Sequence, residues 1–271
     1  MSAETVLPPT QNNKSEAWSK MNIPLMLALG LGTLLLIILV ACFIFSHWIL
    51  IRWYHAKKAS FNDPLYVKML KLAKDAGMPA TGLYFVESPV VNSFSVGNRK
   101  NGSLVLTTGA IERLSVEELA CMMVYEIAYL RGGHRLREIA AVLAGILTML
   151  PVAALWSAVF TGFGQEYEPA PKLIKFFVTS LFAPPAALMI QLTSRESVKY
   201  EADKYAALLC GSEATIGMLS KVRDQESWDV NPSHTPLFIT NPLAKDEIYN
   251  TLFRTRPPIE DRIKRLEEAE Y

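Results

Sequence analysis

Residues 124 to 130, VYEIAYL, set a glutamate and two tyrosines at a spacing that has a defined chemistry. In the motif H-E-x-x-H, two histidines one helical turn apart bind zinc, and the glutamate beside the first acts as a general base. Here Tyr125 and Tyr129 occupy the two histidine positions, and Glu126 occupies the position of the base. Two tyrosines at positions i and i+4 are also ordinary in the core of an amphipathic helix. The stretch alone therefore does not separate a modified site from a packed helix.

The cysteines and histidines do not form a second recognisable site. Cys42, Cys121 and Cys210 are far apart in sequence, and their surroundings predict reduced thiols rather than a disulfide framework. Cys121 lies one turn before Tyr125, but it has no histidine near it in sequence and is expected to be a buried, unreactive thiol. Because no His-x-x-x-His or Cys-x-x-Cys spacing occurs, the sequence predicts no replacement metal site.

Helix-capping and turn residues outline the elements that must position these side chains. Ser115 begins the central helix with a capping box to Glu118, and Gly132 and Gly133 end it. The segments GLYFVESP and SLVLTTG are predicted as short strands joined by the loop NSFSVGNRKNG. Other helices are predicted from Asp63 to Gly77, from residue 194 to Gly211, and from Pro257 and Pro258 onward. These patterns indicate an α+β domain that is mostly helical.

Three apolar blocks predict association with a membrane. Residues 23 to 51 contain no Asp, Glu, Lys or Arg, and about 20 apolar residues suffice to cross a bilayer. Residues 139 to 163 and 176 to 192 are also uncharged, and Pro184 and Pro185 are expected to kink a helix in the later block. We expect about three transmembrane or membrane-inserted helices, the last two forming a hairpin. The alternative for that pair is a buried hairpin in a soluble core.

The distribution of basic residues predicts the orientation in the membrane. Arg52, Lys57 and Lys58 follow the first block, Arg135 precedes the second, and Arg195 follows the third. The polar domain is therefore expected in the cytoplasm, with the chain integral to an inner or plasma membrane and its N-terminus on the opposite side. A net charge of +1 gives no electrostatic basis for binding nucleic acid.

Five segments, in this order and spacing, resemble one protein family. They are AGMPATGLYFVESPVVNSFSVG, LVLTTGAIERLSVEELACMMVYEIAYL, SRESVKYEADKYAALL, HTPLFITNPL and FRTRPPIEDRIKRL. From about residue 61 to the end, the chain resembles the membrane-bound zinc metalloproteases of the HtpX type, relatives of the CAAX-prenyl proteases. The resemblance implies a zincin-type domain with a small sheet, interrupted by the hydrophobic hairpin. The expected parts are a disordered tail (1–21), a transmembrane helix (22–51), a cytoplasmic peptidase-like domain in two pieces (52–137 and 194–271) and the hairpin (138–193).

The same resemblance shows where this chain departs from the family. The first two zinc ligands of the family fall on Tyr125 and Tyr129, and the third, a glutamate, falls on Lys199. The general base is retained as Glu126, and a carboxylate that usually supports the site is retained as Asp203. The resemblance thus implies a degenerate member that lacks the zinc ligands.

The substitutions argue against a bound metal. Zinc binds neutral histidine, thiolate or carboxylate, whereas a phenol with a pKa near 10 is a poor ligand at neutral pH. Lys199 repels a cation and attracts Glu126. We expect Lys199 to replace the metal charge by pairing with Glu126 or Asp203, with the tyrosine hydroxyls completing the hydrogen bonds. The predicted network also includes Arg256, which replaces a histidine thought to assist the reaction, and zinc, the cofactor of the family, is predicted to be lost.

The function that these departures favour is that of a pseudopeptidase. Such a protein would be catalytically inactive and would bind, scaffold or regulate a protein partner in the membrane, such as a protease or a membrane complex. Its groove would keep an edge strand able to pair with an extended peptide. The groove residues expected from the sequence are Asn92, Ser93, Phe94 and Ser95.

Two other functions remain open at this point. An active metalloendopeptidase with an atypical site would hold a metal through Glu126, Asp203 and His134, or would work without one. A structural subunit would use its membrane helices as the interface, where small residues let helices approach closely. The small residues that support this alternative are Gly30, Gly32 and Gly145.

Overall fold

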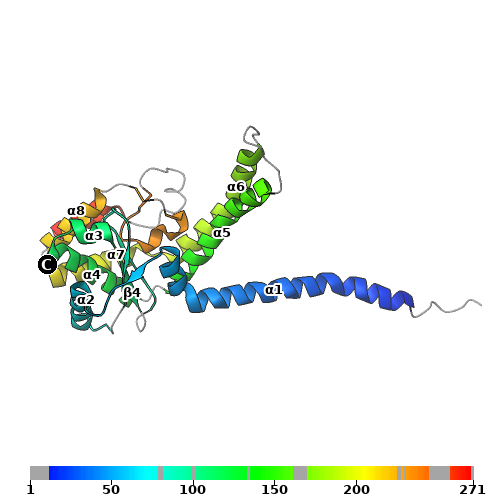
Figure 1. Ribbon diagram of the computed structural model, residues 1–271, viewed down its shortest axis with the longest axis horizontal. Coiled ribbons are helices and arrows are strands. Elements are labelled where there is room, and N and C mark those ends of the chain that lie inside the picture. Colours follow the sequence, from blue (N-terminus) through cyan, green and yellow to red (C-terminus); the bar gives the residue numbers. More distant parts are fainter. Residues whose placement is uncertain are drawn as a thin grey trace, which may run out of the picture. The chain divides into compact units, whose positions relative to one another are not determined.

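The computed structural model describes residues 12–78, 82–98, 102–132, 135–160, 170–224, 227–228, 230–243 and 257–269. Its contacts divide the chain into two compact units that meet in sequence between Phe45 and Ser46. The first unit is formed by the N-terminal part of helix α1 (Asn12–Trp53). The second contains the other helices and the strands that the structure describes (Figure 1).

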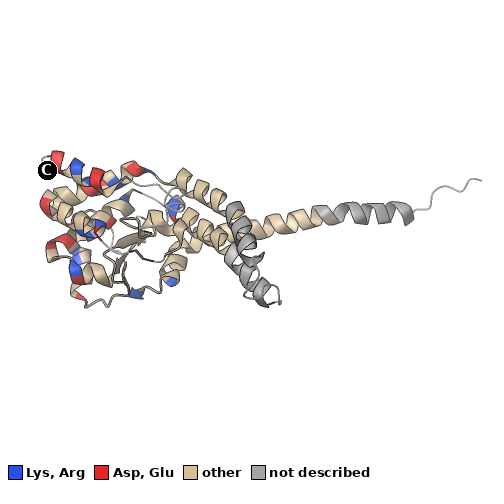
Figure 2. Ribbon diagram, turned by 90° about the horizontal axis from the view of Figure 1, so that it is seen from above, with Lys and Arg blue, Asp and Glu red and all other residues tan. Residues whose placement is uncertain are grey.

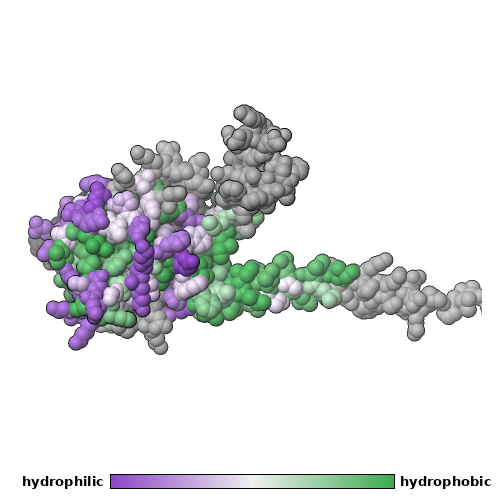
Figure 3. All heavy atoms as spheres, in the orientation of Figure 1, coloured by the Kyte–Doolittle hydropathy of each residue, from purple (hydrophilic) through white to green (hydrophobic). Residues whose placement is uncertain are grey.

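Helix α1 contains the apolar segment predicted near the N-terminus. The stretch Leu25–Trp53 is long and apolar enough to cross a membrane, and the face of it seen in Figure 3 is mostly hydrophobic. The helix begins at Asn12, ahead of the boundary expected at residue 22, because no glycine or proline between them interrupts it. Residues 1–11 of the expected disordered tail lie outside the described residues.

A four-stranded sheet in the second unit has the order β1-β2-β4-β3. Strands β2 (Gly82–Val86) and β4 (Ser103–Thr107) are parallel and confirm the two predicted strands. The predicted loop between them contains another strand, β3 (Ser93–Val96), which pairs antiparallel with β4. Polar and apolar residues alternate along SFSV with the period of a strand, so the loop prediction was wrong there. Strand β1 (Lys57–Lys58) and strand β3 form the two edges.

The helix that carries the tyrosines begins as the sequence predicts. Helix α4 (Val116–Arg131) follows α2 (Pro64–Asp75) and the short α3 (Thr108–Arg113). The Ser115 hydroxyl accepts a hydrogen bond from the Glu118 amide, and the Glu118 carboxylate accepts one from the Ser115 amide. This capping box satisfies two amides at the start of α4 and so defines the register of its side chains.

Helices α5 (Arg135–Phe160) and α6 (Ala170–Thr193) follow in sequence and pack against each other. Helix α6 continues through Pro184 and Pro185. Within the described part of the chain, the segment in α1 alone has the length and composition of a membrane span. Membrane insertion of α5 and α6 therefore stays a prediction.

Four further elements complete the second unit. They are α7 (Glu196–Cys210), α8 (Ser212–Arg223), the 3₁₀ helix η1 (Pro232–Leu237) and α10 (Ile259–Glu268). Helix α7 packs along α4, and α10 packs against both α7 and α8. As predicted, α7 ends at Gly211, whose φ of 93° suits a residue without a side chain. Many charged residues lie on the part of this unit around the C-terminus (Figure 2). The core of the unit is formed mainly by apolar residues, many of them from α4.

Candidate functional site

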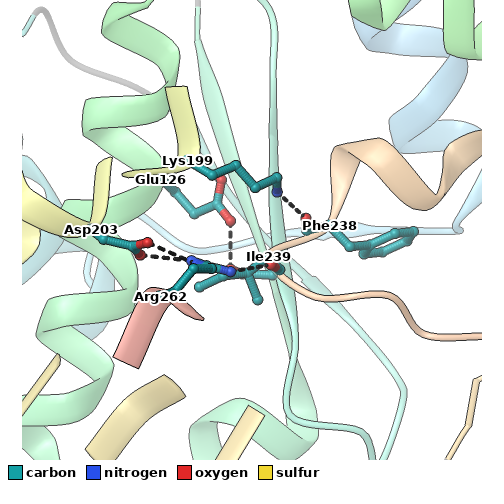
Figure 4. Close-up of polar contacts among 7 residues, drawn as sticks. Glu126, Lys199, Asp203, Phe238, Ile239 and Arg262 are labelled. Atoms are coloured by element: carbon teal, nitrogen blue, oxygen red, sulfur yellow. Dashed lines mark hydrogen bonds and ion pairs between the residues drawn. The ribbon is translucent and has the colours of Figure 1, made fainter. Parts of the chain in front are cut away.

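Helices α4 and α7 bring residues that are far apart in sequence into one buried site (Figure 4). Glu126 of α4 is fully buried, and Lys199 and Asp203 of α7 are 3% and 2% exposed. Figure 4 shows Lys199 beside Glu126, whereas Asp203 points toward Arg262 of α10. Three of the four residues in the predicted network therefore lie in this region. The fourth, Arg256, lies outside the described residues.

The two tyrosines at the metal-ligand positions present their ring faces to cationic side chains. Tyr125 and Tyr129 are buried and stacked, with ring centroids 6.0 Å apart and planes inclined by 13°. The Arg137 Cζ lies 4.1 Å from the Tyr129 centroid, and the Lys199 Nζ lies 4.9 Å from it. The Arg262 Cζ lies 5.2 Å from the Tyr125 centroid. Each such contact contributes about 0.5–2 kcal/mol, so the rings stabilise the buried positive charges.

Glu126 is bonded within the protein interior. Its Oε1 accepts a hydrogen bond from the Ser93 hydroxyl over 2.6 Å. Burial raises the pKa of Glu126 above its ordinary value, and the hydrogen bond from Ser93 opposes this rise. The positive charges of Lys199 and Arg137 also oppose it. A general base must reach a water molecule or a substrate proton, and in this conformation the carboxylate is closed off from solvent.

Lys199 holds a backbone carbonyl of the chain that follows η1. Its Nζ donates a hydrogen bond to the Phe238 carbonyl oxygen over 2.6 Å. The positive charge of the same ammonium group favours the ionised form of Glu126, and so it reduces the rise in pKa that burial causes. Lys199 therefore places a positive charge beside Glu126 and a hydrogen-bond donor beside the chain that follows η1.

The carboxylate of Asp203 pairs with Arg262. The guanidinium donates two hydrogen bonds to it, from Nε to Oδ2 and from Nη2 to Oδ1, each 2.7 Å long. Nη1 of Arg262 donates to the Ile239 carbonyl over 2.9 Å. Arg262 is 1% exposed, and this bidentate pairing with Asp203 compensates the guanidinium charge that burial would otherwise disfavour.

Arg262 was not among the residues selected from the sequence, although the sequence contains a signal for it. The residue lies at helical spacing within the apolar stripe of α10, where a charged side chain must be buried with a partner. The apolar members of that stripe are Ile259, Ile263 and Leu266.

The predicted groove strand is an edge strand, but another part of the chain covers its outer edge. Phe94 of β3 forms an antiparallel bridge with Phe238, and the Ile239 amide donates to the Ser93 carbonyl over 3.0 Å. The Asn92 side-chain amide donates to the Thr240 carbonyl. All four predicted groove residues are buried; they are Asn92, Ser93, Phe94 and Ser95. A peptide can reach this edge only when the segment around Phe238 moves away.

The side chains at this site do not fit a zinc ion. A protein zinc site needs about four N, S or O ligands in their metal-binding protonation states. The positions available are two phenols and an ammonium, and both oxygens of Asp203 are bonded to Arg262. Among the described residues, no three His, Cys, Asp or Glu side chains are grouped to hold a metal. His134, expected in the alternative metal site, lies outside the described residues.

Cys121 also offers no activated nucleophile. Cys121 is fully buried, and its thiol contacts that of Cys210. Both cysteines are free thiols. The contact with Cys210 and burial raise the pKa of Cys121 well above its usual range. A thiol must ionise to act as a nucleophile, so this position supports the expectation of an unreactive cysteine.

Comparison of the sequence with known proteins finds relatives that match most of the chain. The sequence profile of peptidase family M48 matches residues 62–270. A protease HtpX homolog from Desulfatibacillum aliphaticivorans is 30% identical over 250 residues, which cover 88% of this chain and 80% of that protein. A protease HtpX homolog from Pelotomaculum thermopropionicum is 35% identical over 210 residues, 74% of each chain. The crystal structure of S. mikatae Ste24p aligns with a TM-score of 0.49 and 17% identity, covering 87% of this chain and 57% of that one.

Proposed function

The chain belongs to peptidase family M48, and we propose that it is a membrane-anchored member that has lost zinc-dependent hydrolysis and acts by binding or regulating another membrane protein. The apolar segment of α1 supports the anchor. The basic residues that follow this segment support a cytoplasmic location for the second unit. The substituted ligand positions support the loss of hydrolysis.

The observation that carries the proposal is the bond from Lys199 to the Phe238 carbonyl. In a metallopeptidase, the metal polarises a substrate carbonyl, and a general base activates water next to it. Lys199, at the position of the third metal ligand, contributes an ammonium group that bonds a carbonyl of the chain itself. It brings hydrogen-bond donors where a metal needs electron-pair donors, so the site is suited to holding a polypeptide segment.

The same side chains give a reason why hydrolysis is lost. Glu126 is bonded to Ser93 and fully buried, so its carboxylate does not reach solvent water in this conformation. Tyr125 and Tyr129 face cations through their rings rather than offering a pair of imidazole nitrogens to a metal. Each residue that the reaction needs therefore has another structural role.

Metal content and peptidase activity test this proposal on the full-length protein in detergent. We expect dialysed protein to contain far less than one zinc per chain by inductively coupled plasma mass spectrometry, and to cleave casein no faster than Glu126→Gln. The triple variant Tyr125→His, Tyr129→His, Lys199→Glu restores the ligand types and serves as a control for zinc uptake. Stoichiometric zinc in the unmodified protein, or casein cleavage that Glu126→Gln abolishes, would overturn the proposal.

A further inference from the structure

The segment Pro236–Thr240 begins in the last turn of η1 and pairs with the outer edge of β3 at Phe238 and Ile239. The Phe94–Phe238 bridge is antiparallel, and the Ile239 amide donates to the Ser93 carbonyl. Strand addition of this kind uses main-chain hydrogen bonds for affinity and side-chain pockets for specificity. The chain thus supplies its own occupant for the edge at which the groove was predicted.

Four carbonyl groups of this segment are each held by a different side chain. Tyr129 donates to Pro236 over 3.4 Å, and Lys199 donates to Phe238 over 2.6 Å. The other two donors are Arg262, bonded to Ile239 over 2.9 Å, and Asn92, bonded to Thr240 over 3.4 Å. Tyr129 and Lys199 stand at two of the three positions where the family resemblance places zinc ligands. The substitutions that remove a metal therefore also create donors for a backbone.

The Phe238 side chain occupies a subsite formed by three aromatic rings. Its centroid lies 5.0 Å from that of Phe94, 5.3 Å from that of Trp228 and 5.6 Å from that of Tyr54. The Phe94 and Tyr54 rings are also in contact, with centroids 5.3 Å apart. Edge-to-face and tilted pairs at these distances are favourable for aromatic rings. The three rings therefore surround an aromatic side chain at the residue that pairs with Phe94.

We propose that Pro236–Thr240 is an internal pseudoligand of the β3 edge, and that the partner of this site is an extended peptide that presents an aromatic residue to the Phe238 subsite. The inference rests on the proposed function, because a groove that hydrolysed its occupant could not hold it. In the closed state, Tyr129, Lys199 and Arg262 hold the segment. In the open state, the same donors and the subsite receive the partner peptide.

Peptide binding to the full-length protein in detergent tests the inference. The probe is a fluorescein-labelled peptide of residues 233–243, SHTPLFITNPL, whose binding is followed by anisotropy. Phe238→Ala weakens the internal segment and leaves the subsite intact, so the probe should bind at least about tenfold more tightly to this variant than to the unmodified protein. A probe with alanine in place of its phenylalanine should show no such gain. Equal affinity of both proteins for the probe would overturn the inference.

Hydrogen exchange of the unmodified protein gives a second measurement that does not depend on a folded variant. Saturating acetylated peptide of residues 233–243 should accelerate exchange at the Ile239 amide of the chain while the amides of β4 stay protected. Unchanged exchange at Ile239 under these conditions would contradict displacement. Failure of either peptide experiment leaves the zinc and casein results unaffected, so it would reject the pseudoligand without rejecting the proposed loss of hydrolysis.

Discussion

The ammonium group of Lys199 and the carbonyl oxygen of Phe238 are joined by a 2.6 Å hydrogen bond inside the protein. Lys199 is 3% exposed and Phe238 is fully buried, so water cannot easily replace either partner. The bond connects helix α7 to the segment that covers β3. It makes the stability of the site depend on a buried cationic side chain.

Replacing this lysine should destabilise the protein. Lys199→Met keeps most of the side-chain volume but removes the 2.6 Å donor to the Phe238 carbonyl and one of the two positive charges that act on Glu126. We expect a loss of about 1–3 kcal/mol in the free energy of unfolding, the cost of an unsatisfied buried polar group. Urea denaturation followed by tryptophan fluorescence measures it. Lys71→Met, at an exposed position of α2, is the matched control, and equal values for the two variants would contradict the assigned role.

The buried pair of Asp203 and Arg262 predicts a larger effect. Arg262→Met leaves the Asp203 carboxylate buried without its guanidinium, which should cost about 3–5 kcal/mol. The double variant Asp203→Leu, Arg262→Met removes both charges and should recover a substantial part of that loss. Both values come from the same denaturation experiment.

An exposed ion pair supplies the control for this prediction. Arg223 and Asp224 are joined at 2.7 Å with side chains 42% and 63% exposed, and Arg223→Met should cost less than about 1 kcal/mol. If Arg262→Met costs no more than Arg223→Met, the Asp203–Arg262 pair does not stabilise the site.

His234 predicts a dependence of stability on pH. The ring is buried against Tyr54, Trp53 and the backbone of α5 around Gly145, and its Nδ1 lies 2.8 Å from the Tyr54 hydroxyl. Burial lowers the pKa of His234 from 6.5 to about 3. The folded state therefore excludes a proton that the unfolded state accepts below about pH 6.5. The stability present above that pH is lost as the pH falls toward 3, by about 2 kcal/mol between pH 7.5 and pH 5.

Comparison of His234→Gln with the unmodified protein measures that contribution. The variant should lose less stability between pH 7.5 and pH 5, as determined by urea midpoints at the two pH values. Glu126 acts in the opposite direction, because a carboxyl group with a raised pKa favours the folded state as pH falls, but both proteins share that effect. His55→Asn, at an exposed position where asparagine tolerates the φ of 51°, should keep the full pH dependence. Equal slopes for His234→Gln and the unmodified protein would remove His234 as the cause.

The orientation in the membrane can be tested with thiol labelling. Ser15→Cys places a thiol before the apolar segment, whereas the native Cys210 lies in the second unit and is partly exposed. The basic residues after α1 predict that a membrane-impermeant maleimide labels position 15 on intact cells and Cys210 only after permeabilisation. Labelling of Cys210 on intact cells would reverse the proposed topology. The unmodified chain controls for reaction at the native cysteines.

The sequence by itself determined the elements whose signals are local. The capping box at Ser115, the helix end at Gly211 and the strands β2 and β4 follow from residues within a few positions of one another. The resemblance also aligned Tyr125 and Lys199 with the zinc ligands of a known family, and that assignment stays a prediction. The local patterns and the family alignment both depend only on the order of residues along the chain.

Only the tertiary structure decided which partners those residues have. The predicted network named Arg256, whereas the structure pairs Asp203 with Arg262. The spacing of Arg262 within the apolar stripe of α10 indicated that it is buried, but not that its partner is Asp203. The sequence indicated an edge strand near β3 but not that Phe238, far along the chain, covers it. Contacts between distant segments are selected by packing and hydrogen-bond satisfaction across the whole domain, and no local spacing encodes them.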